Sequence, residues 1–333
     1  MKVAQITPYS FPHIGGIEIH VENLSKALSK FYDVEIISSS TIPSLPIPYS
    51  PIPLKKRKCD AEIYHAHVPS PFFAYIYSSE DKFVVTYHND VEVPDEVFGI
   101  SIPRFAAKKI EEINEKVTRK VLDRAEVIIA TTSDYARTSK ILRDYEEKLE
   151  FIPNGVRVED FDFYSEKENF VLYVGRLVKY KGLDCLIEAL ENSEERLVVA
   201  GDGEDRKYFE KMAEEKRVKA KFLGKVEYEK VKELMRKAKC LVLPSKTRLE
   251  AFGIVLLEAM ASGTPVIAYN TPGVREIAKK AGYTFESVEE LREKIKKLDS
   301  KTVRKLGRRG RKVAESYSWE RVAEKISKIY ESL

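Results

Sequence analysis

The sequence of 333 residues contains no long apolar run and only three cysteines. A helix that crosses a bilayer needs about 20 mainly apolar residues, so the sequence predicts none. The cysteines, Cys59, Cys185 and Cys240, are odd in number and far apart, which fits a reducing compartment and offers no zinc spacing. The chain enters a strand-like segment at Lys2, so we expect no signal peptide and a cytoplasmic protein.

A large excess of one charge sign is also missing, because the formal net charge is only +4. The basic surplus lies in the second half, around residues 301–312. A solvated helix face explains it, and attraction to anionic lipid heads or to a phosphorylated ligand is the alternative. The basic residues are not interleaved with aromatic ones, so we expect no nucleic-acid partner.

What the chain does have is an alternation of short apolar strands and amphipathic helices, repeated in both halves. Strands are predicted at 2–6, 33–38, 62–67, 82–87, 126–131, 148–152, 169–174, 196–200, 219–223, 240–244 and 265–269. Helices are predicted at 17–30, 102–124, 134–143, 182–190, 204–216, 227–237, 253–262, 273–280, 287–298, 301–316 and 319–332. The pattern predicts an α/β protein with two doubly wound, Rossmann-like domains.

Polar residues near 161–169 separate the two patterns. We therefore expect an N-terminal domain over 1–163 and a C-terminal domain over 164–317. The last helix, within 318–333, could pack on either domain.

The most informative segment holds two carboxylates eight positions apart, Glu250 and Glu258. Glu250 follows a strand and a polar loop, whereas Glu258 falls inside the next helix. Ligands of open α/β sheets bind at the carboxyl ends of the strands. Two carboxylates there, beside a helix N-terminus, suit a ligand with hydroxyls and a phosphate. Glycosidase chemistry is an alternative use of such a pair, but the helical placement directs the two at different parts of one ligand.

Two cations follow an earlier strand of the second half, Arg176 and Lys181. At the carboxyl edge of a sheet they can neutralise a diphosphate, and surface cations capping a turn are the alternative. In the first half, Gly15 and Gly16 form a strand-to-helix turn that allows a ligand close to the backbone. Their spacing is not that of the dinucleotide fingerprint.

All five histidines lie in the first 90 residues. His88 ends one predicted strand, and His65 and His67 end another, so each could hydrogen-bond a polar substrate. His20 falls in the first helix, where we expect a structural role. No helical histidine pair or cysteine partner supports zinc, so we expect no metal and no cofactor.

Together these residues resemble the nucleotide-sugar glycosyltransferases of glycosyltransferase family 4, which have the GT-B fold. The resemblance covers nearly the whole chain and is carried by Gly15-Gly16-Ile-Glu18, Thr86-Tyr-His88, Ile152-Pro-Asn154-Gly155-Val156, Gly175-Arg176 through Lys181-Gly182, Ala200-Gly-Asp-Gly203, Phe222-Leu-Gly224, Glu250-x7-Glu258 and Glu258-Ala-Met-Ala-Ser-Gly-Thr-Pro-Val266.

The resemblance implies a role for each matched residue. Glu250 would hold hydroxyls of the donor sugar, Glu258 would bind the ribose, and Arg176 and Lys181 would bind the diphosphate. Further donor contacts would come from Gly15, Gly16, Phe252, Gly253, Ile254 and Val255, from the backbone at Gly224, Lys225 and Val226, and from His88 against the transferred sugar.

The implied activity is a retaining, metal-independent transfer of a hexose from a UDP- or GDP-linked sugar to a hydroxyl acceptor. The acceptor would be an oligosaccharide or a lipid-linked glycan. A nucleotide-sugar epimerase or hydrolase on the same scaffold is the main alternative, and a catalytically silent binding module is another.

The acceptor side has weaker signals. The aromatic stretch 72–77, the proline-rich basic loop 41–58 and the helix 102–124 could face a lipid-linked acceptor at the inner face of a membrane. Core packing explains the aromatic stretch equally well, and a surface loop explains residues 41–58.

Overall fold

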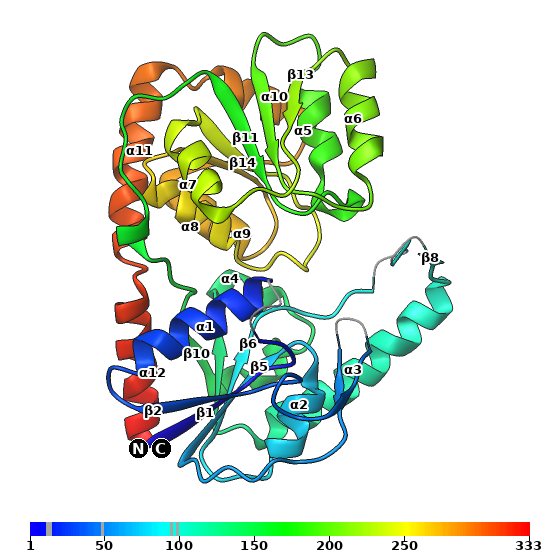
Figure 1. The fold of residues 1–333 in the computed structure, drawn as a ribbon, viewed down its shortest axis with the longest axis vertical. Coiled ribbons are helices and arrows are strands. Elements are labelled where there is room, and N and C mark those ends of the chain that lie inside the picture. The colour runs from blue at the N-terminus through cyan, green and yellow to red at the C-terminus, as the bar shows by residue number, and fades with distance from the viewer. Residues whose placement is uncertain (11–14, 48–49, 94–95, 98–99) are drawn as a thin grey trace. The chain divides into compact units, whose positions relative to one another are not determined.

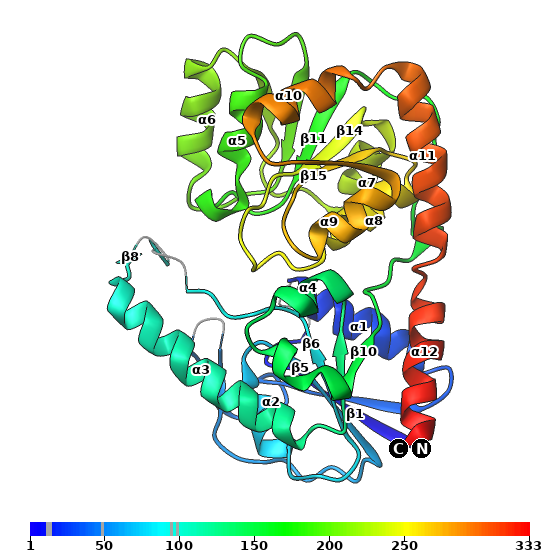
Figure 2. The same cartoon turned by 180° about the vertical axis from the view of Figure 1, so that it is seen from behind.

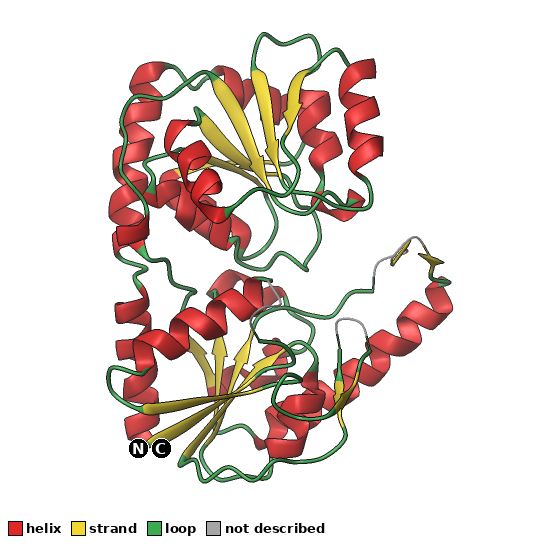
Figure 3. Cartoon of the chain, in the orientation of Figure 1, coloured by secondary structure: helices red, strands yellow, loops and turns green. Residues whose placement is uncertain are grey.

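The computed structural model describes residues 1–333 apart from 11–14, 48–49, 94–95 and 98–99. The chain divides into two compact units, one made of Met1–Gly155 with Trp319–Leu333 and the other of Val156–Ser318. Each unit is a parallel sheet with helices on its faces (Figures 1 and 3), so the α/β fold class with two Rossmann-like domains is confirmed.

The sheet of the first unit has six parallel strands in the order β10-β9-β6-β5-β1-β2. These strands are β1 (Lys2–Ile6), β2 (Asp33–Ile37), β5 (Ile63–Val68), β6 (Phe83–Tyr87), β9 (Val127–Ala130) and β10 (Leu149–Phe151). The helices are α1 (Gly16–Leu28), α2 (Pro71–Tyr77), α3 (Arg104–Arg124), α4 (Ser133–Thr138), the 3₁₀ segment η1 (Leu142–Lys148) and α12 (Trp319–Ser332). Two further pairs of short strands are antiparallel, β3 (Ser44–Leu45) with β4 (Ile52–Pro53) and β7 (Glu96–Val97) with β8 (Ile100–Ser101).

The sheet of the second unit also has six parallel strands, in the order β13-β12-β11-β14-β15-β16. They are β11 (Phe170–Val174), β12 (Arg196–Ala200), β13 (Lys219–Phe222), β14 (Cys240–Leu243), β15 (Val266–Tyr269) and β16 (Gly282–Phe285). The helices are η2 (Val158–Asp160), η3 (Lys179–Lys181), α5 (Leu183–Ala189), α6 (Arg206–Glu215), α7 (Tyr228–Lys237), α8 (Ile254–Ala261), α9 (Val274–Ala281), α10 (Val288–Lys296) and α11 (Ser300–Glu315).

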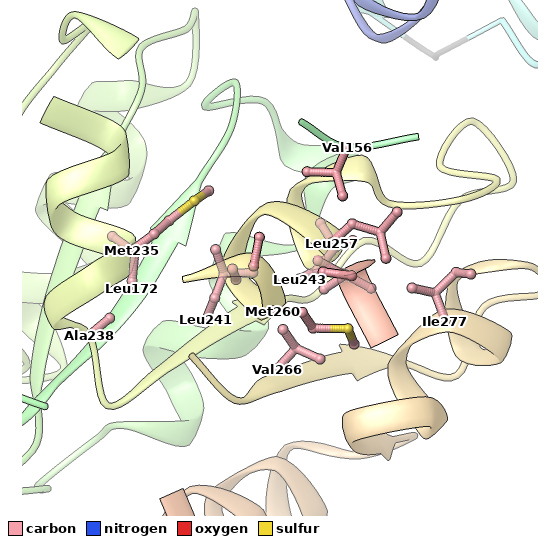
Figure 4. Close-up of a cluster of buried hydrophobic side chains, with 14 of the residues drawn as sticks. Val156, Leu172, Met235, Ala238, Leu241, Leu243, Leu257, Met260, Val266 and Ile277 are labelled. Carbon is pink, nitrogen blue, oxygen red and sulfur yellow. The ribbon is translucent and has the colours of Figure 1, made fainter. Parts of the chain in front are cut away.

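Alternate residues of these strands enter two separate cores, as the two-residue period of a strand requires. Leu172, Leu241 and Val266 face the helices α7, α8 and α9 on one side, where Met260 joins them (Figure 4). The residues in between face α5, α6 and α10 on the other side (Figure 2). Both faces are therefore covered, which explains the continuous apolar strand sequences.

The structure differs from the sequence-based prediction in several local elements. The predicted helix 134–143 is α4 followed by the 3₁₀ segment η1, with Tyr145 outside helical geometry. The strand β16, which pairs with β15, and the helix α2 were not predicted from the sequence. Within α2, Phe73 and Tyr77 are fully buried, so half of the aromatic side chains of the stretch 72–77 pack into the core, whereas Tyr75 is exposed.

The change between units falls at Gly155–Val156, several residues before the predicted boundary near 161–169. The reason is that Val158 and Phe161 already belong to the apolar core of the second unit. The C-terminal helix α12 packs with α1 in the first unit, where Val322 and Ile326 are buried. No helix among the described residues is long and apolar enough to cross a membrane.

The basic helix α11 lies against α8, and a glycine permits their close approach. A Cβ atom added at Gly307 would lie 2.3 Å from the carbonyl oxygen of Gly263. Arg311, one turn further on, donates hydrogen bonds to the carbonyl oxygens of Phe161 and Ala261, each at 2.7 Å. Part of the basic surplus near 301–312 therefore fixes the helix in place.

Gly307→Ala should destabilise the protein by about 1–2 kcal/mol, because the steric cost of overpacking exceeds the intrinsic preference of a helix for alanine. Urea unfolding measures this change in the free energy of unfolding. Lys305→Ala, at an exposed position of the same helix, is the control and should change it by less than about 0.5 kcal/mol. A more stable Gly307→Ala protein would contradict the packing described here.

Candidate active site

The sheet order of the second unit brings distant loops to one edge. β11 and β14 are neighbours, and the chain winds outward from them in opposite directions, through β12 and β13 and through β15 and β16. Ligands of open α/β sheets bind outside the carboxyl ends of the strands at such a switch point. Arg176 and Lys181 follow β11, and Glu250 follows β14, so three predicted site residues meet there.

At this point Lys181 and Glu250 form an ion pair, with 2.7 Å between Nζ and Oε2. Both side chains are about one-fifth exposed, at 21% and 20%. Burial lowers the pKa of Lys181, but the charge and the hydrogen bond of Glu250 outweigh it, so the pKa is raised overall. Lys181 is therefore cationic at neutral pH and available to an anionic ligand.

A glycine links the two sides of this pair. Gly182 has φ +74°, a left-handed conformation that side chains rarely adopt, and an added Cβ would lie 2.3 Å from the carbonyl oxygen of Pro244. The segment that carries Lys181 thus lies directly against the start of the loop that leads to Glu250. No other residue fits this crossing without moving the loop.

Arg176 is the exposed member of the cationic pair. Its guanidinium donates a hydrogen bond to the hydroxyl of Tyr180 and lies 5.8 Å from the centre of that ring. The backbone carbonyl of Arg176 accepts a hydrogen bond from the buried Tyr173 hydroxyl at 2.9 Å. Two aromatic side chains absent from the sequence-based site therefore position this arginine.

The helix α8 begins immediately after the predicted donor residues. Gly253 is its N-cap with φ +77°, Phe252 is buried, and Ile254 and Val255 form the first turn. Its first backbone N–H groups lack partners within the helix, and the helix dipole adds partial positive charge there. An anion at this terminus would be stabilised.

Glu258 lies one turn into α8, and the hydroxyl of Tyr228 on α7 donates a hydrogen bond to its Oε1 at 2.7 Å. Burial raises the pKa of Glu258, and the Tyr228 hydrogen bond lowers it only in part. Glu250 precedes the helix by four residues, so the two carboxylates differ in environment. This is unlike a pair of cooperating glycosidase carboxylates at one bond.

Two further loops approach the same edge after β12 and β13. The N–H of Gly201 donates a hydrogen bond to the carbonyl oxygen of Gly224 at 2.9 Å. Gly224 is buried, Lys225 is exposed and Val226 is partly buried. One lone pair of the Gly224 carbonyl oxygen is thus engaged, and the rest of the backbone of Gly224, Lys225 and Val226 remains for the predicted contact with the base.

Two buried hydroxyls lie in the loop between β14 and Glu250. Neither Ser245 Oγ nor Thr247 Oγ1 has a hydrogen-bond partner among the described residues. Buried polar atoms normally find partners, so these suit a ligand that brings its own hydroxyls. Sequence reasoning passed over them because loop serines and threonines are common.

The predicted residues of the first unit lie at the carboxyl edge of its own sheet. Gly15 is the extended N-cap of α1, and Gly16 is its first residue. A Cβ atom added at Gly16 would meet nothing within 4 Å among the described residues, so packing does not require a glycine there. His88 directly follows β6. The neighbouring His13 lies outside the described residues.

His88 belongs to a buried histidine cluster that the sequence-based prediction did not recognise. His67 Nδ1 and His88 Nε2 are 3.1 Å apart, and the ring of His20 lies 4.7 Å from that of His88. Burial lowers the pKa of His67 and His88 well below the usual value, and lowers that of His20 to about 4. The cluster is therefore neutral at physiological pH.

One nitrogen from each of His20, His67 and His88 lies within 4.8 Å of the others, an arrangement that could hold a metal ion. Composition alone allowed a zinc site, but no spacing in the sequence pointed to these three residues, because they come from a helix, a strand and a loop. His20 Nδ1 contacts Asn154 Oδ1 at 2.7 Å, so the residue expected to be structural is held by Asn154 of the motif 152–156.

Comparison with known proteins assigns both halves of the chain. Residues 159–313 match the family model of glycosyl transferases group 1, and residues 41–160 match that of glycosyltransferase family 4. An uncharacterized glycosyltransferase of Methanocaldococcus jannaschii is 30% identical, with 100% of this chain and 99% of that protein covered. Phosphatidyl-myo-inositol mannosyltransferase of Mycobacterium tuberculosis is 26% identical, with 100% and 97% covered.

Solved structures show the same fold. Sucrose-phosphate synthase from Thermosynechococcus elongatus matches with a TM-score of 0.80 and 21% identity, over 99% of this chain and 98% of that one. HepE of Anabaena in complex with UDP matches with a TM-score of 0.74 and 17% identity over all of both chains.

Glu258→Gln should stabilise the ligand-free protein at neutral pH. A carboxyl group whose pKa is raised in the folded state costs stability at neutral pH, and this cost grows as the pH rises from the unfolded pKa to the folded pKa and is constant above it. The gain from glutamine should vanish below the unfolded pKa of about 4.3. Denaturant unfolding between about pH 4 and 8 tests this. Glu229→Gln, at an 82% exposed side chain, should give no such gain.

Proposed function

Because this chain belongs to glycosyltransferase family 4, whose enzymes have the GT-B fold, we propose that it transfers a hexose from a nucleotide-diphosphate sugar to a hydroxyl acceptor. We propose further that the transfer retains the anomeric configuration and needs no divalent metal. The observation that carries the proposal is the Lys181–Glu250 pair at the switch point, beside the N-terminus of α8.

The chemistry follows from the charges at this edge. Breaking the glycosidic bond leaves a nucleotide diphosphate anion and oxocarbenium character on the sugar. Lys181, Arg176 and the first N–H groups of α8 would stabilise that anion in place of a metal ion. Preorganisation matters here, because groups already oriented cost no rearrangement when the charge develops.

The carboxylates would divide the rest of the donor between them. Glu250 would accept hydrogen bonds from sugar hydroxyls while it keeps Lys181 oriented. Glu258, with Tyr228 on one oxygen, would accept from the ribose through its other oxygen. In the first unit, the resemblance assigns Gly15 and Gly16 to the diphosphate and His88 to the transferred sugar. HepE was solved with UDP, which supports a nucleotide donor here without fixing the base.

Lys181→Ala and Glu250→Ala should each lower the rate of sugar transfer by about 100-fold, as removal of one preorganised stabilising group does in other enzymes. Release of labelled nucleotide diphosphate from the donor, with and without acceptor, measures the reaction. Equal release without acceptor would indicate a hydrolase, and conversion of the donor into another nucleotide sugar without net release would indicate an epimerase. Two variants with near wild-type transfer would exclude the mechanism.

The second unit offers a matched control at the opposite edge of its sheet. Lys239 and Glu195 form an ion pair of 2.5 Å with side chains 13% and 16% exposed, and they precede β14 and β12. Lys239→Ala should therefore disturb stability as Lys181→Ala does, yet leave transfer nearly unchanged.

We also propose that the acceptor is lipid-linked and that α3 contacts an anionic membrane surface. Phe105, Ile110 and Ile113 of this helix are 79%, 49% and 47% exposed, among several basic side chains. A helix with exposed apolar and basic residues suits a membrane interface. The mycobacterial relative, named as a phosphatidyl-myo-inositol mannosyltransferase, supports a lipid acceptor.

The protein should sediment with phosphatidylglycerol vesicles at low salt and not with phosphatidylcholine vesicles. Phe105→Ser should weaken this binding. Phe31→Ser, at a 57% exposed position outside α3, should not. Absence of wild-type binding to the anionic vesicles would remove the membrane proposal and leave sugar transfer unaffected.

A further inference from the structure

A chain of buried polar groups crosses the apolar interior of the first unit and ends at His88. Its members are Thr86, His65, Tyr330, Gln5, His67 and His88. The first five are at most 1% exposed, and His88 is 7% exposed. This hydrogen-bonded chain therefore begins in the core and ends at the slightly exposed His88, which is the residue assigned to the sugar.

Tyr330 of the C-terminal helix α12 stands in the middle of this chain. Its hydroxyl oxygen accepts a hydrogen bond from Gln5 Nε2 at 3.1 Å and lies 2.6 Å from His65 Nδ1. Gln5 occupies one lone pair of the Tyr330 oxygen, so the hydroxyl proton is available for donation to His65 Nδ1. His65 Nε2 then carries the proton and donates to Thr86 Oγ1 at 2.7 Å.

The other end of the Gln5 amide fixes His67. Gln5 Oε1 can only accept, so His67 Nε2 carries a proton and donates to it at 2.7 Å. His67 is neutral, so its Nδ1 has a lone pair. The donor in the 3.1 Å contact between His67 and His88 is therefore His88 Nε2. In a neutral imidazole, this leaves the lone pair of His88 on Nδ1.

We propose that Tyr330 is a positioning residue for His88, which it holds, through Gln5 and His67, with the proton on Nε2 and the lone pair on Nδ1. His88 then meets the ligand as a hydrogen-bond acceptor, which suits a sugar hydroxyl. The inference rests on the proposed function in one respect, namely that His88 contacts the transferred sugar. Through Tyr330, the C-terminal helix would then contribute to the selection of that sugar.

The orientation of the Gln5 amide decides which atom donates the proton in each hydrogen bond of this chain. If the amide turned over, Tyr330 would donate to Gln5, every later proton would move, and His88 would present an N–H instead. Removing the Tyr330 hydroxyl breaks the link between the Gln5 amide and the tautomer of His65. Tyr330→Phe should thus mix the two tautomers of His88 without adding or removing charge.

Metal binding by this histidine cluster would require a different protonation of the histidine nitrogens. A metal ion on His20, His67 and His88 needs a lone pair on the coordinating nitrogen of each. His88 Nε2 donates its proton to His67 in the arrangement described, so it could not coordinate there. A metal ion bound through His88 Nε2 would require that nitrogen to be deprotonated, whereas the hydrogen-bonded chain requires it to carry a proton.

Long-range ¹H–¹⁵N spectra of the ¹⁵N-histidine-labelled full chain read these protonation states directly, with His88 identified by the signals lost in His88→Asn. We expect the Nε2–H form for His88 in the wild type and a mixture in Tyr330→Phe. Transfer by Tyr330→Phe should fall roughly three- to tenfold, the effect of one weakened hydrogen bond.

Tyr32→Phe is the matched control, because the Tyr32 ring packs edge-on against Tyr330 at 5.6 Å while the chain of hydrogen bonds passes through Tyr330. It should leave both the tautomer and the transfer rate unchanged. If Tyr330→Phe does not fold, Thr86→Val removes the acceptor at the far end of the chain and should also mix the tautomers.

Three results would overturn the inference: an Nδ1–H form of His88 in the wild type, an unaltered tautomer in Tyr330→Phe and Thr86→Val, or stoichiometric Zn²⁺ binding that shifts the His88 signals. An altered tautomer with an unchanged transfer rate would also overturn the positioning role. The spectra require no donor, so they remain readable even if the Lys181 and Glu250 variants disprove the proposed reaction.

Discussion

The parallel pairing of β11 with β14 is the constraint on which the proposed site depends. Parallel strands place all their carboxyl ends at one edge, and each connection must return across a face of the sheet through a helix. Since the chain leaves this pair in opposite directions, the loops after β11 and β14 diverge at this edge, as they do at the ligand sites of open α/β sheets. Lys181 and Glu250, from those two loops, meet there.

The charged and polar groups at this edge are better explained by ligand binding than by the stability of the fold. Lys181 and Glu250 offset the cost of each other's burial, but Glu258 has a raised pKa and only a tyrosine hydroxyl as partner. Ser245 and Thr247 add buried hydroxyls that the described protein does not satisfy. A polyhydroxylated diphosphate would supply partners of both kinds, which is consistent with membership of a nucleotide-sugar glycosyltransferase family.

In the first unit, buried polar groups are stabilised by hydrogen bonds to one another. His65 and His67 are neutral, because desolvation disfavours the charged form of each, and they hydrogen-bond to Tyr330 and to Gln5 respectively. A hydrogen-bonded polar network inside an apolar core favours one arrangement of side chains. The return of the chain to this unit as α12 supplies the tyrosine that completes the network.

The sequence by itself determined the features that depend on local pattern. Strand and helix alternation predicted two doubly wound domains, and the order of motifs from Gly15 to Glu258 indicated the family, both of which are confirmed. Helix and strand periodicity is local, so it can be read without knowing the fold. The short strand β16 escaped notice because its place is set by pairing with β15 rather than by its own four residues.

Tertiary structure alone decided which of these residues meet. Lys181 lies 69 positions from Glu250, and Gln5 lies 325 positions from Tyr330, so neither partner is implied by its neighbours in the chain. The same holds for the aromatic stretch around Phe73, whose burial follows from the packing of α2, and for the histidines, which only the sheet brings together. Sequence periodicity predicts which face of a helix or strand is buried, but the order of strands in the sheet decides which residues become neighbours.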